Sequence, residues 1–317
     1  MSINIIRSNN RWYVQKSDTT GTLIDTAAAT TAALLADRDA ISAAIAAEAV
    51  TLPDSPLQSP VTAPCRVVAQ MTNFVSHIRD SGFNPETVPM TYFRKTSHSI
   101  SGPDDDIIKP HHVRFLDYEV EIGLVIGHDI PVGTTITSEN IADHVAALVV
   151  TNDISARDLQ LPKTQFFEAK SYPTFTPTGP RLVVLEPGDW ERFEDLRLKL
   201  WVNGEVRQDA LVGEDMRYKP LEALQGLSQF QPLATGDLVL TGTPGGTALK
   251  APPKPVELIG ALLPTAVKWK AFFKAQAKNP RYLADGDFVE VHIRTEDGKL
   301  DLGRQRSHVR YAGQPAL

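Results

Sequence analysis

The sequence predicts a mainly β fold with some helices, in the α+β class, with a small N-terminal α/β subdomain. Short runs of β-branched and apolar residues recur along the chain, separated by Pro, Gly and Asp. Few helical periods interrupt these runs, so the regular alternation of strand and helix that builds a parallel sheet is missing. Helical composition is concentrated instead in an Ala-rich stretch near the N-terminus.

The first 66 residues are predicted to form this subdomain and a linker. Residues 11–25 are typical of a short β-hairpin, and residues 26–50 have helical composition that is broken at residues 37–39. A proline-rich loop follows at residues 52–60. We therefore expect a second, main domain over residues 67–317.

The main domain is predicted to be built mostly of strands. The expected strands are residues 116–127, 145–151, 181–186, 196–203, 237–241, 288–294 and 308–311. The expected helices are residues 138–144, 220–229 and 262–276. We find no internal repeat among these segments.

The net charge and the single cysteine narrow the classes of partner and compartment. A formal net charge of -6, with no basic stripe among the 32 Lys and Arg, argues against nucleic-acid binding. We find neither a secretory signal nor an apolar run of the ~20 residues that span a bilayer. Cys65 stands alone, which suits a reducing compartment. We expect a cytoplasmic protein that acts on a small molecule, without nucleic-acid or membrane partners.

The stretch Phe115–Gly127 places three carboxylates on one face of a predicted strand. Because side chains alternate along a strand, Asp117, Glu119 and Glu121 point to the same side. By itself such a face is typical of the solvent side of a sheet. The apolar continuation Ile122–Gly127 argues against a fully solvated face, and unpaired buried carboxylates are costly. A bound cation would remove that cost.

A second apolar run, Val145–Val150, ends in Thr151-Asn152-Asp153. Asp153 therefore stands where a strand releases into a loop, a common position for a site residue held by a rigid scaffold. Carboxylate oxygens without His or Cys at ligand spacing favour a hard cation over zinc. The sequence thus indicates Mg²⁺ or Mn²⁺, and Ca²⁺ stays open.

His77 and Asp80 lie three residues apart. On a short helix or turn this spacing brings the carboxylate beside the imidazole, which fixes the ring tautomer and raises its basicity. His77 could then act as a general base that takes a proton from water. The alternative is a surface ion pair of little energetic worth.

Lys170 could hold an anionic oxygen of a substrate if it lies beside a cation, whereas the alternative is an ordinary solvated lysine. Arg157 and Gln160 would share a side with Asp153 if residues 155–160 form one helical turn. They could clamp a substrate carboxylate or simply be solvated.

Leu240–Gly246 is a Gly-rich loop after a predicted strand, and its free N–H groups could bind an anion. The loop lacks the Lys and the spacing of a Walker A motif, which disfavours nucleotide binding. A plain tight turn is the alternative.

Together these segments resemble the fumarylacetoacetate hydrolase family over residues 67–311. The motifs that carry the resemblance are Asn73-Phe-Val-Ser-His77, Phe93-Arg-Lys95, Asp117-Tyr-Glu-Val-Glu-Ile-Gly123, Asn152-Asp-Ile-Ser-Ala-Arg-Asp-Leu-Gln160, Lys170-Ser171 with Pro177-Thr-Gly-Pro180, and Thr241-Gly-Thr-Pro244. The motifs that begin at Asp117 and Asn152 are specific signals, and the others support them.

The resemblance implies a mixed β-roll of stacked sheets that pairs into homodimers. It implies that Glu119, Glu121 and Asp153 hold the metal, that His77 is the general base, and that Lys170 stabilises developing negative charge. It also implies substrate-lining roles for Phe93, Lys95, Arg157, Gln160 and Thr243.

The sequence departs from the family pattern at three places. Hydrolytic members carry a Glu three residues after the His, whereas this chain has Asp80, which is shorter by one methylene. Phe74 stands where Tyr is common, which removes a hydroxyl. Residues 248–287 look like an insertion that could cap or narrow the active site.

We expect hydrolysis of a carbon–carbon bond in a small acylpyruvate or related 1,3-diketo acid, a step typical of aromatic-compound catabolism, giving a carboxylic acid and a 2-keto acid. His77, oriented by Asp80, would deprotonate the attacking water, while Lys170 and the Mg²⁺ or Mn²⁺ share the enolate charge. One alternative is decarboxylation of a β-keto acid such as oxaloacetate, or tautomerisation of a 2-hydroxymuconate-type acid. Another is a non-catalytic module that binds Ca²⁺.

Overall fold

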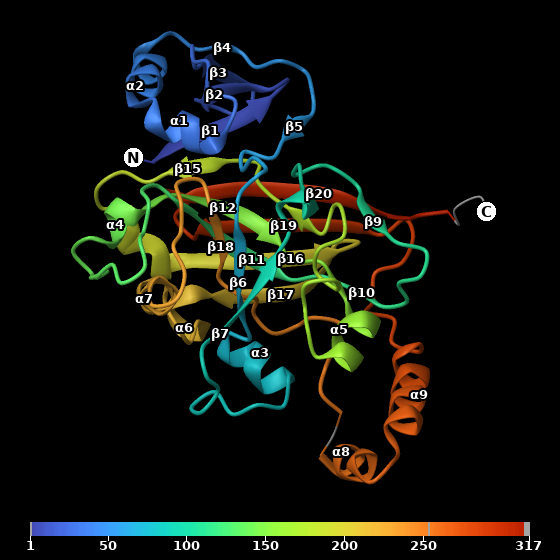
Figure 1. Cartoon of the computed structure of the whole chain (residues 1–317). Coiled ribbons are helices and arrows are strands. Elements are labelled where there is room, and N and C mark those ends of the chain that lie inside the picture. Colours follow the sequence, from blue (N-terminus) through green and yellow to red (C-terminus); the bar gives the residue numbers. More distant parts are fainter. Residues whose placement is uncertain (1, 253, 314–317) are drawn as a thin grey trace.

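The computed structural model describes residues 2–252 and 254–313, and its largest element is an 11-stranded sheet (Figure 1). Its strands are β1 (Ile3–Ser8), β2 (Arg11–Gln15), β3 (Thr20–Leu23), β4 (Val50–Thr51), β5 (Leu57–Gln58), β6 (Val67–Met71), β7 (Thr91–Lys95), β11 (Val120–Ile126), β12 (Val145–Asn152), β15 (Leu182–Val184) and β18 (Leu238–Leu240). The strand order is β4-β3-β2-β1-β15-β12-β11-β18-β6-β7, with β5 beside β1. β18 and β6 are parallel, whereas β11 is antiparallel to both of its neighbours.

A second, 5-stranded sheet is stacked on the first. Its strands are β9 (Ile107–Lys109), β16 (Leu196–Val202), β17 (Glu205–Leu211), β19 (Phe288–Thr295) and β20 (Asp301–Tyr311), in the order β17-β16-β19-β20-β9. β11 contacts β16, and β12 contacts β19 and β20, so the sheets face each other. Two-stranded pairs join β8 (Ile100–Ser101) to β14 (Thr176–Pro177) and β10 (Leu116–Asp117) to β13 (Ser155–Ala156).

The helices are short and lie around the sheets (Figure 1). They are α1 (Thr31–Ala36), α2 (Arg38–Ala46), α3 (Val75–Asp80), α4 (Ile141–His144), α5 (Arg157–Lys163), α6 (Val212–Asp215), α7 (Pro220–Ser228), α8 (Lys254–Ala261) and α9 (Thr265–Gln276), with 3₁₀ turns at Ser97–Ser99 and Trp190–Asp195. In the described part of the chain, every helix falls short of the length and apolar character that crossing a bilayer requires. The predicted mainly β, α+β class with stacked sheets is confirmed.

The N-terminal residues form the predicted hairpin and the predicted broken helix. β2 pairs antiparallel with β3, and the Ala-rich stretch forms α1 and α2. Asp37 ends α1 and caps α2, because its Oδ1 accepts a hydrogen bond from Ala40 N over 3.3 Å. β1 then pairs with β15, so the sheet continues from the N-terminal strands into the main domain. The domain boundary at residue 66 stays a prediction.

Apolar side chains are buried on both faces of the large sheet. Along β11, Ile122 and Leu124 lie in the core between the two sheets, whereas Val125 lies in the core toward α1 and α2. Such a strand carries an almost continuous apolar run. By alternation, Glu119 and Glu121 share the face of Val125, at the end of the strand where the apolar run stops.

Some element boundaries differ from the prediction. Residues 116–127 form two strands, β10 and β11, because the chain changes partner strand between them. The predicted helix at 262–276 begins only at Thr265, after Pro264, and α8 precedes it. The predicted helix at 138–144 is limited to α4. The exposed strand β17 has too little apolar alternation to be found from sequence.

α8 and α9 form a helical hairpin that extends away from the sheets (Figure 1). Five aliphatic side chains on it are well exposed, namely Val256, Leu258, Leu262, Leu263 and Val267. The stem of the hairpin packs on the body of the protein, where Phe273 and Tyr282 contact the ring of Phe115. This hairpin is the segment predicted as an insertion, and its capping role stays a prediction.

Candidate active site

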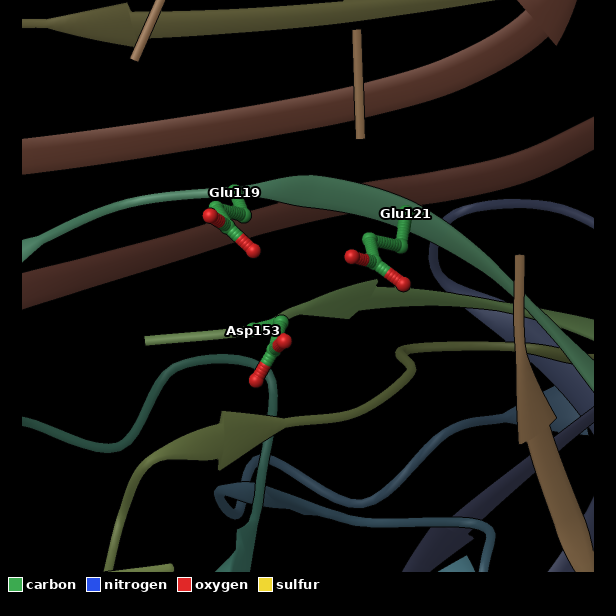
Figure 2. Close-up of side chains that lie close together, drawn as sticks. All are labelled: Glu119, Glu121 and Asp153. Atoms are coloured by element: carbon green, nitrogen blue, oxygen red, sulfur yellow. The ribbon is translucent and has the colours of Figure 1, made fainter. Parts of the chain in front are cut away.

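Glu119, Glu121 and Asp153 lie side by side where β11 and β12 meet (Figure 2). Val120 is opposite Asn152 in this antiparallel pair, and Asp153 N donates to Glu119 O over 2.8 Å. One carboxylate oxygen from each of the three residues lies within 4.8 Å of the others, and all three side chains are buried. The structure thus brings together the three residues predicted to hold a metal.

Three buried cations surround these carboxylates. Lys170 Nζ donates to Glu119 Oε2 and to Asp153 Oδ2, each over 2.6 Å. Lys95 Nζ donates to Asp153 Oδ1 over 2.5 Å. Arg157 Nη2 donates to Glu119 Oε1 over 2.5 Å. The interpretation of Lys170 as a solvated lysine is therefore wrong, and Lys95 holds a carboxylate of the cluster.

The Arg157 guanidinium is held by protein groups on three sides. Besides Glu119, it donates from Nε to Asp117 Oδ2 over 2.9 Å and from Nη1 to Gln160 Oε1 over 2.8 Å. Arg157 and Gln160 are both buried, so the solvated alternative is wrong for them too. In this structure the guanidinium bonds side chains of the protein, and a contact of Arg157 or Gln160 with a substrate carboxylate stays a prediction.

Among the described residues, Glu121 has no cationic partner within salt-bridge distance. Its Oε2 accepts a hydrogen bond from Gly242 N over 2.8 Å. Gly242 has φ +82°, and a Cβ there would lie 2.8 Å from Asn73 Cβ, so glycine is required. The anion bound by the Gly-rich loop is thus a carboxylate of the protein. In the same loop, Thr243 Oγ1 accepts from Gln208 Nε2 over 2.8 Å.

The balance of buried charge leaves one carboxylate unpaired. The buried carboxylates of this cluster are Asp117, Glu119, Glu121 and Asp153, and the buried cations that contact them are Lys95, Arg157 and Lys170. Burial raises the pKa of Glu121 well above its usual value, and the charges of Asp153 and Glu119 raise it further. Burial acts on Glu119 in the same direction, but Lys170 and Arg157 outweigh it and lower the pKa of Glu119.

The donor set fits a hard divalent cation. Three carboxylates converge, one of them lacks a cation, and carboxylate oxygens are what Mg²⁺ and Mn²⁺ prefer. A divalent cation held by Glu119, Glu121 and Asp153 would neutralise Glu121. It would also change the excess charge of the buried group from one negative to one positive.

His77 lies on α3 within electrostatic reach of the cluster. The charges that act on its ring include those of Glu119, Arg157 and Lys170. Burial is the largest effect and lowers the pKa of His77 below its usual value. Among the described residues, its Nδ1 is buried without a hydrogen-bond partner. The ring is therefore a neutral base at pH 7.

Asp80 does not pair with His77 in this structure. Its Oδ2 accepts from Gly246 N over 3.1 Å, and its Oδ1 accepts from Lys250 Nζ over 3.3 Å. The short carboxylate at the end of α3 thus contacts the Gly-rich loop and the residue Lys250 that follows it. The predicted orientation of His77 by Asp80 is therefore corrected. A role for Asp80 in catalysis stays a prediction.

Phe93 lies beside Lys170, whose Nζ is 5.3 Å from the centroid of the Phe93 ring. The same ring contacts Phe166 edge-on, with 5.2 Å between centroids. Phe93 and Lys95 point to the same side of β7 because they are two residues apart. Phe93 thus forms an apolar wall of the cluster, and its contact with a substrate stays a prediction.

Two residues that support the site were not predicted. Asn152 Oδ1 accepts from Glu119 N over 2.9 Å and so fixes the backbone of a metal-ligand candidate. Gln208 Oε1 accepts from Val120 N over 3.0 Å. The position of Asn152 next to Asp153 is a signal that could have identified it. Gln208 lies on the mostly exposed β17 and gives no such signal.

Comparison with known proteins identifies a family model and relatives that this chain resembles. A family model described as fumarylacetoacetate (FAA) hydrolase C-terminal matches residues 66–310. The mitochondrial oxaloacetate tautomerase FAHD2A of Bos taurus is 36% identical over 219 residues, which are 66% of this chain and 66% of that protein. The oxaloacetate tautomerase YisK of Bacillus subtilis (strain 168) is 35% identical over 210 residues, covering 64% of this chain and 67% of that protein.

The fold has matches among solved structures as well. A probable 2-hydroxyhepta-2,4-diene-1,7-dioate isomerase from Mycobacterium abscessus is 31% identical, with a TM-score of 0.74. That match covers 99% of this chain and 100% of the other chain, so it includes the N-terminal strands. The sequence relatives are matched over about two thirds of their length only.

Proposed function

Because this chain belongs to the fumarylacetoacetate hydrolase family, we propose that it is a metal-dependent tautomerase of a small keto acid of the oxaloacetate type. Two relatives carry the name oxaloacetate tautomerase, and a structural neighbour is named as a dienedioate isomerase. Tautomerisation moves a proton between a carbon and an oxygen and uses no water as a reactant. These names support the predicted alternative over the predicted hydrolysis.

The environment of His77 favours tautomerisation over hydrolysis. Hydrolysis needs a base that is oriented to deprotonate water, yet Asp80 bonds Gly246 and Lys250. Tautomerisation needs a neutral base that takes a proton from the carbon next to the keto group. His77 meets that need, because burial lowers its pKa and keeps the ring neutral.

The charge of the site suits an anionic keto acid. With a divalent cation bound, the buried group of seven side chains has one excess positive charge. Burial by itself would lower the pKa of Lys170, but Asp153 and Glu119 outweigh it and raise that pKa above its usual value. The Lys170 ammonium therefore stays charged and can donate to a substrate oxygen that becomes anionic.

In the proposed reaction, His77 removes a proton from C3 of the keto acid and Lys170 stabilises the charge that develops on the C2 oxygen. The proton that His77 has taken up then returns, directly or through water, to the C2 oxygen and completes the enol, and the reverse sequence returns the keto form. Mg²⁺ or Mn²⁺ at Glu119, Glu121 and Asp153 would supply a Lewis acid for the keto oxygen. Arg157 keeps Glu119 in place for that purpose.

Hydrolysis of an acylpyruvate and decarboxylation of oxaloacetate stay predictions. Both reactions pass through an enolate, so the same cation and the same lysine would serve them. The relatives favour an enzyme that acts on keto acids over a non-catalytic Ca²⁺-binding module. The homodimer implied by the family resemblance stays a prediction as well.

The proposal is tested by following the ultraviolet absorbance of enol-oxaloacetate. Chelator-treated protein is compared with protein reloaded with Mg²⁺ or Mn²⁺, using an acylpyruvate and a 2-hydroxymuconate as parallel substrates. We expect metal-dependent acceleration of enol decay without cleavage of the acylpyruvate. Cleavage of the acylpyruvate, with enol decay no faster than in buffer, would instead establish the hydrolase.

A further inference from the structure

Asp117 bonds the chain that leads into the α8–α9 hairpin, at Ala248 and Leu249. It also bonds Arg157, which contacts the carboxylate cluster. The stem of the hairpin is defined here as Ala248–Leu249 on one side and Phe273–Tyr282 on the other.

The side chain of Asp117 is buried, and each of its oxygens accepts two hydrogen bonds. Oδ1 accepts from Tyr118 N over 2.9 Å and from Ala248 N over 2.8 Å. Oδ2 accepts from Arg157 Nε over 2.9 Å and from Leu249 N over 3.1 Å. All the acceptor sites of this carboxylate are thereby used, so it is not a metal ligand.

Arg157 transmits the position of Asp117 to Glu119. One guanidinium bonds both carboxylates, and its planar, rigid fork fixes the angle between them. Because Arg157 holds Oε1 of Glu119, Oε2 is turned toward Lys170 and the remaining carboxylates. A shift of Asp117 would therefore rotate the guanidinium and displace the carboxylate of Glu119.

The hairpin stem is tied down next to Asp117. Asn279 Nδ2 donates to Ala248 O over 2.8 Å, which joins the two ends of the inserted segment. Arg281 Nη2 donates to Gly246 O over 2.7 Å, just before the stem. Any displacement of the stem thus reaches the two backbone N–H groups that bond Asp117.

We propose that Asp117 is a positioning residue for the metal ligand Glu119, and that it links the stem of the α8–α9 hairpin to the metal centre. The inference rests on the proposed function, because it takes Glu119 as a ligand. The physical reason is competition for Arg157. Without the charge of Asp117, Arg157 would attract Glu119 more strongly and weaken its hold on a cation.

The test is Asp117→Asn in the full chain, with Mn²⁺ binding measured by calorimetry and by electron paramagnetic resonance. The amide keeps the shape but points N–H groups at Arg157 Nε and Leu249 N. Loss of a group that orients a metal ligand weakens metal binding by roughly 10- to 100-fold, and we expect that loss here. Asn279→Ala, which frees only the stem, is expected to weaken Mn²⁺ binding by a smaller factor.

Asp237→Asn is the matched control. Asp237 is also buried, pairs with Arg66 over 3.0 Å and accepts from Ala234 N over 2.8 Å. It precedes β18 and lies beside Ile126, five residues along β11 from Glu121 and so roughly 17 Å away. This substitution should lower thermal stability in the same way and leave Mn²⁺ affinity unchanged.

Wild-type Mn²⁺ affinity in Asp117→Asn would overturn the inference. If that variant does not fold, Arg157→Lys replaces it, because a single ammonium cannot bridge Asp117 and Glu119 while bonding Gln160. Unchanged Mn²⁺ affinity in Arg157→Lys would then overturn the positioning role of Asp117. Unchanged Mn²⁺ affinity in Asn279→Ala would remove only the link to the hairpin. Turnover of the wild type with and without metal is measured in parallel. If the wild type shows metal-dependent turnover while the variants keep wild-type Mn²⁺ affinity, the positioning role is wrong and the proposed function stands.

Discussion

The Lys170 ammonium lies 2.6 Å from Glu119 Oε2, and both side chains are buried. The same ammonium lies 2.6 Å from Asp153 Oδ2, so one cation bridges two of the carboxylates that are candidates to hold a metal. It therefore neutralises part of the cluster even before a divalent cation binds.

Replacing Lys170 by Met should destabilise the chelator-treated protein. Glu119 and Asp153 each lose one of their two buried cationic partners, since Arg157 and Lys95 remain, and breaking a buried pair costs about 3–5 kcal/mol. Mn²⁺ should restore part of that loss, because its charge replaces the ammonium. Thermal unfolding with chelator and with Mn²⁺ measures both effects.

Lys163→Met is the control for this variant, because Lys163 pairs with Glu168 on an exposed surface. The loss of unfolding free energy in Lys163→Met should stay below about 1 kcal/mol and should be the same with chelator and with Mn²⁺. Equal stability of Lys170→Met and the wild type in chelator would contradict the assigned ion pairs.

His77→Asn and Asp80→Asn separate the two reaction types. A tautomerase loses its base in His77→Asn, and general-base catalysis is worth roughly 10²- to 10⁴-fold in rate. Asp80→Asn should reduce the rate much less than His77→Asn does, because Asp80 bonds Gly246 and Lys250 and not the imidazole. Steady-state rates on the true substrate measure both. Equal, large losses in the two variants would argue for the water-activating pair.

The pH dependence of turnover should report His77. Burial lowers its pKa below the usual 6.5, so the neutral base persists to lower pH than in solution. The unfolded chain then binds more protons than the native protein below pH 6.5, so His77 also makes stability decrease as the pH falls. We expect kcat/KM to be level above pH 6.5 and to decrease only below it.

His292→Asn serves as the control for this profile, since His292 pairs with Asp301 on the second sheet. Its profile should match that of the wild type. A rate that already declines with an apparent pKa above 7 would be inconsistent with a buried neutral His77.

Gly242→Ala should damage both stability and metal binding. The backbone at Gly242 has φ +82°, and the new Cβ would meet Asn73 Cβ at 2.8 Å. Strain of this kind costs about 1–3 kcal/mol, and any shift of the loop withdraws the N–H that bonds Glu121. Gly133→Ala has the same strain at φ +85° with nothing within 4 Å, so it should leave Mn²⁺ affinity intact. Equal Mn²⁺ affinities in the two variants would contradict the role of Gly242.

The candidate metal ligands could be predicted because local patterns encode them. Alternation along one strand places Glu119 and Glu121 together, and the end of the next apolar strand places Asp153. The partners of these side chains could not be predicted in the same way. Gln208 supports Val120 from 88 residues further along the chain, on a strand without an apolar pattern.

The His77–Asp80 pair shows why spacing alone is insufficient. Positions three apart on a helix can meet, but the carboxylate of Asp80 bonds whichever donors lie closest in the folded chain. Those donors are Gly246 N and Lys250 Nζ, more than 160 residues away in sequence. Strand order has the same limitation, since β1 pairs with β15 although residues 9–181 lie between them in the sequence.

A proton NMR time course of oxaloacetate in deuterated buffer tests the proposed tautomerase most directly. Metal-loaded protein should speed the exchange of the C3 hydrogens for deuterium well beyond the rates with metal alone and with chelated protein, while the carbon skeleton stays intact. Formation of pyruvate at the rate of exchange would reveal a decarboxylase. Exchange no faster than in the two controls would contradict the tautomerase.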